Sequence, residues 1–162
     1  MNRYQSFRQS PKDALKTTKI IHFALLTGQA MFAAVAYSIG NKQISFVTKD
    51  SKNDIFLYLV PIFAIGGFVA GNFISKKILA NFQNKETLSE KLAGYQTALI
   101  VKCALLEGAS LMGIVAFLLT NNWLFLLISI AIMLYFFTLK PTADKVADDL
   151  QLNYDEKVEL GA

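Results

Sequence analysis

The chain has 162 residues, and 54% of them are hydrophobic, against roughly 45–50% in a typical soluble domain. Its net charge of +4 is small, and its basic residues are dispersed without the interleaved aromatic residues of a nucleic-acid-binding surface, so composition excludes that class of partner. The single cysteine, Cys103, excludes a disulfide within one chain.

The apolar residues are concentrated in four blocks, at 18–39, 57–79, 97–120 and 123–139. Each block is about 17–25 residues long, which is the length that an α-helix needs to cross about 30 Å of hydrocarbon. Soluble bundles rarely contain four such helices in succession. The sequence therefore predicts an all-α integral membrane protein whose four transmembrane helices form one domain over residues 1–140.

The connections between the blocks predict two antiparallel hairpins. Asn121 and Asn122 make a tight link between the third and fourth blocks, and a longer loop joins the first two. Most of the 16 Lys and Arg residues lie before the first block, between the second and third, and after the fourth. By the positive-inside rule, both the N- and the C-terminus are then cytoplasmic, and we expect a multi-pass protein of the inner (cytoplasmic) membrane.

Residues 141–162 form an acidic cytoplasmic tail. Pro141 follows the fourth block and is well placed to begin a new, short helix. Val146, Leu150 and Leu152 would give that helix one narrow apolar edge. We expect it either to lie against the cytoplasmic loop or to dock a partner.

Small residues in the second and third blocks predict close helix packing. Glycines spaced four apart let two membrane helices approach each other. Five glycines are assigned to this role: Gly66, Gly67, Gly71, Gly108 and Gly113. Asn72 lies beside the first three, and we expect it to face protein because an amide in hydrocarbon needs a partner.

The first and third blocks indicate an internal duplication. Residues 22–29 (HFALLTGQ) pair with residues 102–109 (KCALLEGA), and they share an Ala-Leu-Leu-x-Gly core. Both hairpins would start from the same side of the membrane, so the repeats are parallel. Transporters contain such repeats, but parallel repeats are not restricted to them.

Glu107 is the sharpest functional candidate, because it is the only acid inside the four blocks. On insertion scales, a charged Asp, Lys or Arg at the centre of a membrane helix costs about 2.5–3.5 kcal/mol, so such residues are functional candidates by default. The duplication pairs Glu107 with Thr27, and Gln29, Asn72 and Ser110 lie at comparable depth. These five residues form the predicted ion-binding cluster.

Three interpretations of Glu107 remain open from the sequence. It binds and releases H⁺ or Na⁺, it is a neutral structural acid hydrogen-bonded to Asn72 or Thr27, or it pairs with a cation of a partner subunit. Lys102 is expected to snorkel toward the membrane surface, and His22 to be a polar residue near the interface.

No enzyme signature is present. The sequence has no nucleophile with a base, no His, Cys or acid cluster at metal spacing, and no phosphate-binding loop. We therefore expect a non-enzymatic protein without a metal or other cofactor.

Residues 59–120 resemble the proteolipid c subunit of rotary ATP synthases. The resemblance is carried by the segments GGFVAGNF, SEKLAGYQTA and ALLEGASLMGIVAFLL. It implies that Glu107 is an H⁺- or Na⁺-carrying carboxylate and that Gly67 and Gly71 are packing glycines. The chain departs from that family at residues 81–85, which lack an Arg-Gln-Pro-type turn, and at Lys102.

The whole chain, with TTKIIHFALLTGQ near its start and KPTADKVADDLQL near its end, looks like a family of uncharacterised four-helix bacterial inner-membrane proteins. We expect a protein that acts through helix packing in a homo-oligomer or with other membrane subunits, with a protonatable Glu107 at mid-membrane. The alternatives are c-subunit-like H⁺ or Na⁺ translocation and an accessory subunit of a respiratory or assembly complex.

Overall fold

The computed structural model describes residues 10–40, 45–46 and 55–162. The first nine residues and most of the loop before the second apolar block, which carry part of the expected charge asymmetry, lie outside these ranges. Within them, the helices in chain order are α1 (Pro11–Ile39), α2 (Phe56–Gln83), α3 (Leu88–Thr120), α4 (Trp123–Thr138), α5 (Ala143–Asp149) and α6 (Tyr154–Leu160). The described residues form no strand, so the prediction of an all-α fold is confirmed.

Three of these helices, α1, α2 and α3, are each long and apolar enough to cross a membrane. α4 has only 16 residues, and it adds a fourth span when it is joined to α5 across a bend of 87°. The described part of the chain thus has the three or four apolar helices of a multi-pass membrane protein.

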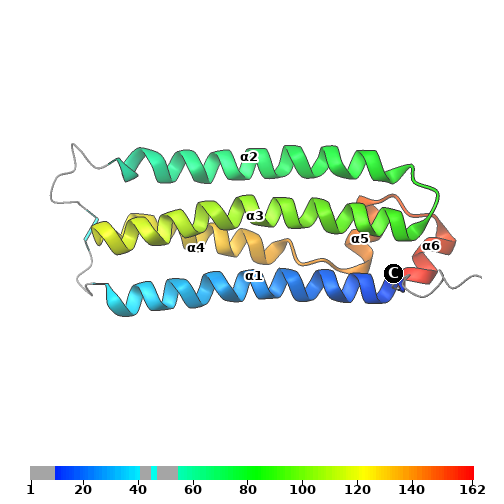
Figure 1. The fold of residues 1–162 in the computed structure, drawn as a ribbon, viewed down its shortest axis with the longest axis horizontal. Coiled ribbons are helices and arrows are strands. Elements are labelled where there is room, and N and C mark those ends of the chain that lie inside the picture. Colours follow the sequence, from blue (N-terminus) through cyan, green and yellow to red (C-terminus); the bar gives the residue numbers. More distant parts are fainter. Residues whose placement is uncertain (1–9, 41–44, 47–54) are drawn as a thin grey trace, which may run out of the picture.

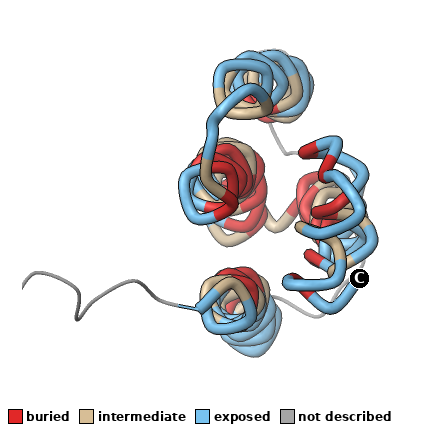
Figure 2. The backbone as a smooth tube through the Cα atoms, turned by 90° about the vertical axis from the view of Figure 1, so that its right-hand side faces the viewer, coloured by how far each residue is buried: buried red, intermediate tan, exposed pale blue. Residues whose placement is uncertain are grey.

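α3 lies at the centre of the bundle, and the other long helices pack around it. α1 and α2 flank α3 on opposite sides, and α4 runs along a third side (Figures 1 and 2). α3 accordingly buries residues along its whole length, from Leu88 to Phe117. The sequence predicts hairpins as the units of packing, whereas α1 and α2 each contact α3 more extensively than they contact each other.

α4 ends before the bundle does, and side chains from two other helices bind its last carbonyl groups. His22 on α1 is buried and donates a 3.0 Å hydrogen bond from Nε2 to the carbonyl oxygen of Phe136. Lys145 on α5 donates from Nζ to the carbonyl oxygen of Thr138 at 2.9 Å. The last four carbonyls of a helix have no partner within the helix, so these bonds explain how α4 can stop inside the protein.

The C-terminal residues fill the space that α4 leaves beside α1 and α3. α5 and α6 close this end of the bundle (Figure 1). Their apolar side chains join a buried cluster with α1 and α3 that includes Leu15, Leu88, Leu92, Val146, Leu150, Leu152 and Leu160. The sequence predicts one short helix with a narrow apolar edge, whereas the structure has two short helices that belong to the core.

The helix boundaries follow local signals in the sequence. Ser10 caps α1, and Thr87 caps α3 by accepting a hydrogen bond from the amide of Glu90. Asn121 ends α3 in the left-handed conformation, with φ at 59°, which Asn tolerates better than most residues. Asn122 then caps α4, so the tight link between α3 and α4 has the predicted length.

Candidate functional site

Glu107 lies on α3 where the buried stripe of the helix meets its exposed stripe. Leu106 and Ser110 beside it are buried, whereas Ala104 and Gly108 are exposed. The Glu107 side chain is half-buried, and within the described residues it has neither a hydrogen bond nor an ion pair. The acid therefore lies at a surface that is open to lipid or to another protein.

The structure does not bring the five residues of the predicted cluster together. Thr27 is exposed on α1. Asn72 donates from Nδ2 to the carbonyl oxygen of Phe68 in its own helix at 2.8 Å, and it lies beside Lys102, about one and a half turns from the level of Glu107. The oxygen ligands that a sodium ion needs are thus not assembled around this acid within the described residues.

Gln29 and Ser110 instead belong to a polar strip inside the bundle. Both are fully buried, and their side chains have no hydrogen-bond partner among the described residues. His22 and Cys103 line one small cleft between α1 and α3, so they lie at the same height along the bundle. Gln29 follows His22 by about two helical turns, and Ser110 follows Cys103 by the same distance, so Gln29 and Ser110 also lie at the same height. Ser129 on α4 adds to the strip by donating to the carbonyl oxygen of Ser110 at 2.8 Å.

Three of the five glycines assigned to packing lie where helices approach closely within the chain. A Cβ added at Gly67 would lie 2.8 Å from the carbonyl oxygen of Leu105, and one at Gly71 would touch the backbone and side chain of Lys102. A Cβ at Gly113 would collide with the Oγ of Ser129. These three positions hold α2 and α4 against α3.

The other two glycines, Gly66 and Gly108, line an open groove between α2 and α3. A Cβ at either position would meet no atom of the described residues within 4 Å. The groove has a volume of about 420 Å³, and the small side chains of Ala70 and Ala104 continue its floor. Glu107 precedes Gly108 in the chain and borders the same exposed stripe of α3, but it does not line this groove, which we call the α2–α3 groove.

A basic pocket lies between α2, α3 and α5, and the sequence does not predict it. Its volume is about 140 Å³, and its charged lining residues are Lys76, Lys102, Lys145 and Asp149. The Nζ atom of Lys102 also lies 5.7 Å from the centre of the Tyr135 ring. The signal in the sequence is a lone lysine inside an apolar block, but only the fold brings lysines of three helices together.

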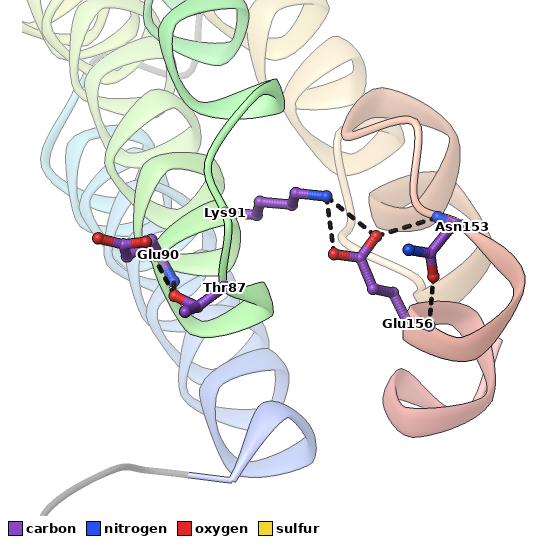
Figure 3. A network of polar contacts seen from close by, with 5 residues as sticks. All are labelled: Thr87, Glu90, Lys91, Asn153 and Glu156. Carbon is purple, nitrogen blue, oxygen red and sulfur yellow. Dashed lines mark hydrogen bonds and ion pairs between the residues drawn. The ribbon is translucent and has the colours of Figure 1, made fainter.

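An ion pair holds α6 against the first turn of α3 (Figure 3). The Nζ atom of Lys91 lies 2.7 and 3.0 Å from the two carboxylate oxygens of Glu156, and the amide of Asn153 donates to the second of these oxygens. Burial would raise the pKa of Glu156, but the hydrogen bonds from Lys91 and Asn153 and the charge of Lys91 outweigh burial and lower that pKa below its ordinary value. This ion pair stabilises the packing of α6 against α3.

The described residues contain no group of three or more His, Cys, Asp and Glu side chains that could bind a metal ion. Within the same described residues, the notable features are an unpartnered acid at the edge of the exposed stripe of α3, an open groove between α2 and α3, and a basic pocket on another side of α2. Comparisons with protein-family models, with curated proteins and with solved structures find no match, so an assignment of function rests on these features.

Proposed function

We propose that this chain is a non-enzymatic integral membrane protein that acts as a subunit of an oligomer or of a larger complex. It binds a transmembrane helix of another subunit in the α2–α3 groove, and that helix lies over the exposed stripe of α3 that Glu107 borders. The observation that carries the proposal is an open groove of small residues on a helix whose exposed stripe also borders an acid without a partner among the described residues.

The distribution of charge supports a membrane position for the bundle. Within residues 20–39, 55–75 and 103–138, Glu107 is the only Asp, Glu, Lys or Arg. At the end of the bundle that α5 and α6 close, a lysine lies within two residues of each stretch: Lys19, Lys76, Lys102 and Lys140. Residues 40–54, which join the first two stretches, carry only three of the 16 Lys and Arg residues. Because lysines accumulate on the cytoplasmic side of bacterial membranes, we place this end and both termini in the cytoplasm, and the protein in the inner membrane.

The same boundary gives the depth of Glu107. Lys102 packs against Gly71 and lines the basic pocket, so we take it as the cytoplasmic edge of the hydrocarbon. Glu107 then lies about 7.5 Å inside that edge, rather than at mid-membrane as the sequence suggests. At this depth a carboxyl group is costly to leave charged and alone, so it favours a neutral form or a polar partner.

A transmembrane helix is the occupant that fits the groove. Membrane helices associate through van der Waals packing and hydrogen bonds rather than through the hydrophobic effect, so their interfaces favour small residues. The open Gly66 and Gly108 let a neighbouring backbone approach closely. A donor on the neighbouring helix would satisfy Glu107.

The test uses two glycines at matched positions of the duplicated segments. Gly28 and Gly108 are both exposed, and a Cβ at either meets no atom within 4 Å, so a leucine fits either site in the isolated chain. We expect Gly108→Leu to lose its partner during purification in mild detergent, while Gly28→Leu keeps it. A Gly108→Leu variant that co-purifies with an unchanged partner would contradict the proposal.

An acid open to a neighbouring subunit is also what a c-subunit-like carrier of H⁺ or Na⁺ requires. Glu107→Gln separates the two functions. Under the subunit proposal, this variant weakens assembly, and the wild type shows no ion flux in vesicles. Under the translocation alternative, assembly persists and ion flux is lost. Co-purification with a defined respiratory or assembly complex would identify an accessory subunit.

A further inference from the structure

Two hollows adjoin each other beside α2 and over α3, and they form the basic end and the apolar end of one cleft. The basic end is the pocket lined by Lys76, Lys102 and Lys145. The apolar end is a groove of about 430 Å³ that α2, α3 and α4 form. Its lining residues include Ala64, Phe68, Leu106, Ile128, Ala131 and Ile132. We call the whole feature the α2–α4 cleft.

The two ends of the cleft meet at Tyr135. Its ring lines the apolar groove and lies 5.1 Å from the ring of Phe68, measured between centres. The ammonium group of Lys102 lies over the same ring. On α2, Phe68 of the groove is followed one turn later by Asn72 of the pocket, so the polar and apolar linings are continuous.

We propose that the α2–α4 cleft binds one anionic phospholipid, with its phosphate among the three lysines and an acyl chain along the apolar groove. This site lies on a different side of α2 from the partner helix proposed above and does not depend on it.

Charge and depth both favour this occupant. Three ammonium groups face one carboxylate, that of Asp149, so the pocket carries an excess of positive charge. Lysines bind phosphate oxygens as point charges, and basic pockets between membrane helices on the cytoplasmic side bind anionic headgroups. The pocket lies at the edge of the charge-free stretches, where headgroups are found, and the groove leads from it into those stretches. A soluble anion would fill only the pocket.

Binding of the headgroup is tested by replacing lysines that line the pocket and, as a control, a lysine that lies outside it. Lys77 neighbours Lys76 on α2 and is exposed, but it does not line the pocket. Lipid binding to the full chain in detergent is measured by native mass spectrometry with phosphatidylglycerol and with phosphatidylcholine. We expect the wild type to prefer phosphatidylglycerol, the double variant Lys76→Gln/Lys102→Gln to bind it at least tenfold more weakly, and Lys77→Gln to bind it as the wild type does.

Asp149→Asn gives a test in the opposite direction. It removes the one negative charge of the pocket, so we expect it to bind phosphatidylglycerol severalfold more tightly. This variant keeps the proposal testable even if the double lysine variant does not fold. An unchanged affinity in Asp149→Asn, or equal binding of the two lipids by the wild type, would overturn the proposal.

The acyl chain is tested by filling the groove. Ala131 lines the groove and is exposed, and Ala34 on α1 is equally exposed but lies outside it. We expect Ala131→Phe to weaken binding of long-chain phosphatidylglycerol about tenfold, to leave a dihexanoyl form unaffected, and Ala34→Phe to change neither. If Ala131→Phe has no effect and millimolar inorganic phosphate displaces the lipid, the pocket takes a soluble anion and the proposal fails.

Discussion

The two halves of the bundle are held together in different ways. One half consists of residues 20–39, 55–75 and 103–138, and we call it the charge-free half because Glu107 is its only Asp, Glu, Lys or Arg. There α3 meets its neighbours through small residues, as at Gly67 against Leu105 and at Gly113 against Ser129. In the half that α5 and α6 close, side chains bind backbone groups and one another, as at His22 and in the pair of Lys91 with Glu156. Lipid offers no hydrophobic drive between helices, so close packing dominates there, whereas charged groups work where water is near.

Both candidate sites lie where one of these two patterns is left incomplete. In the charge-free half, no atom of the described residues lies within 4 Å of a Cβ added at Gly108. In the capped half, Lys76 and Lys102 line a pocket whose lysines outnumber its single acid. Each half thus exposes the same kind of groups that stabilise it. We therefore expect the charge-free half to bind a helix and the capped half to bind an anion.

The largest effect is expected from breaking the close approach in the charge-free half. Gly113→Val places side-chain atoms where Ser129 Oγ lies and 3.0 Å from the carbonyl oxygen of Phe125, so we expect a loss of about 3 kcal/mol in the free energy of unfolding. Denaturant unfolding in micelles measures it. Gly108→Val is the matched control and should change stability by less than about 1 kcal/mol. Equal losses in the two variants would remove the distinction between packed and open glycines.

A smaller effect is expected from breaking the capped half. Glu156→Gln leaves Lys91 largely buried without a carboxylate, and hydrogen bonds between charged groups contribute about 1.5–3 kcal/mol. We expect about 2 kcal/mol of lost protection in the amides of residues 143–160, measured by hydrogen exchange, with residues 103–138 unchanged. Loss of protection throughout the bundle would show that the two halves are not separate.

Acid should loosen the same end of the wild-type protein. The pKa of Glu156 is lowered on folding, so its contribution is complete above its ordinary pKa of 4.5 and is lost as the pH falls through the lower, folded value. We expect protection of α6 to decline below about pH 4.5 in the wild type and to be less pH-dependent in Glu156→Gln. The same decline in both proteins would assign it to other carboxyl groups.

The smallest effect concerns the polar strip inside the charge-free half. Gln29 is fully buried, and neither its amide nitrogen nor its oxygen has a partner among the described residues. Replacing an unsatisfied amide by an apolar group of similar size removes a desolvation cost, so we expect Gln29→Leu to stabilise the protein by about 1 kcal/mol. Destabilisation would instead show that the Gln29 amide has a polar partner inside the folded protein.

The sequence predicts the features that local signals control. Four apolar blocks, the caps at Ser10 and Thr87, and the tight turn at Asn121 are all readable, because hydrophobic length and capping act over a few residues. The early end of α4 is not readable, since its carbonyls are satisfied by His22 and Lys145 from distant parts of the chain. The basic pocket is hidden for the same reason: its lysines meet only after folding.

The predicted cluster around Glu107 shows the limit of reasoning from depth alone. Thr27 has a level comparable to that of Glu107, but it lies on the exposed face of α1. Gln29 and Ser110 have suitable levels and point into the bundle instead. The rotation of each helix about its own axis decides which side chains face each other. Packing against α3 sets that rotation, and an apolar sequence specifies such packing only weakly.

Site-specific photo-crosslinking in native membranes tests whether a helix of another subunit occupies the α2–α3 groove. A photoreactive residue in place of Gly108 lies at the α2–α3 groove, and one in place of Gly28 lies on an equally open face of α1. We expect a protein adduct of discrete mass from position 108 and only lipid adducts from position 28. Lipid adducts alone from both positions would contradict it.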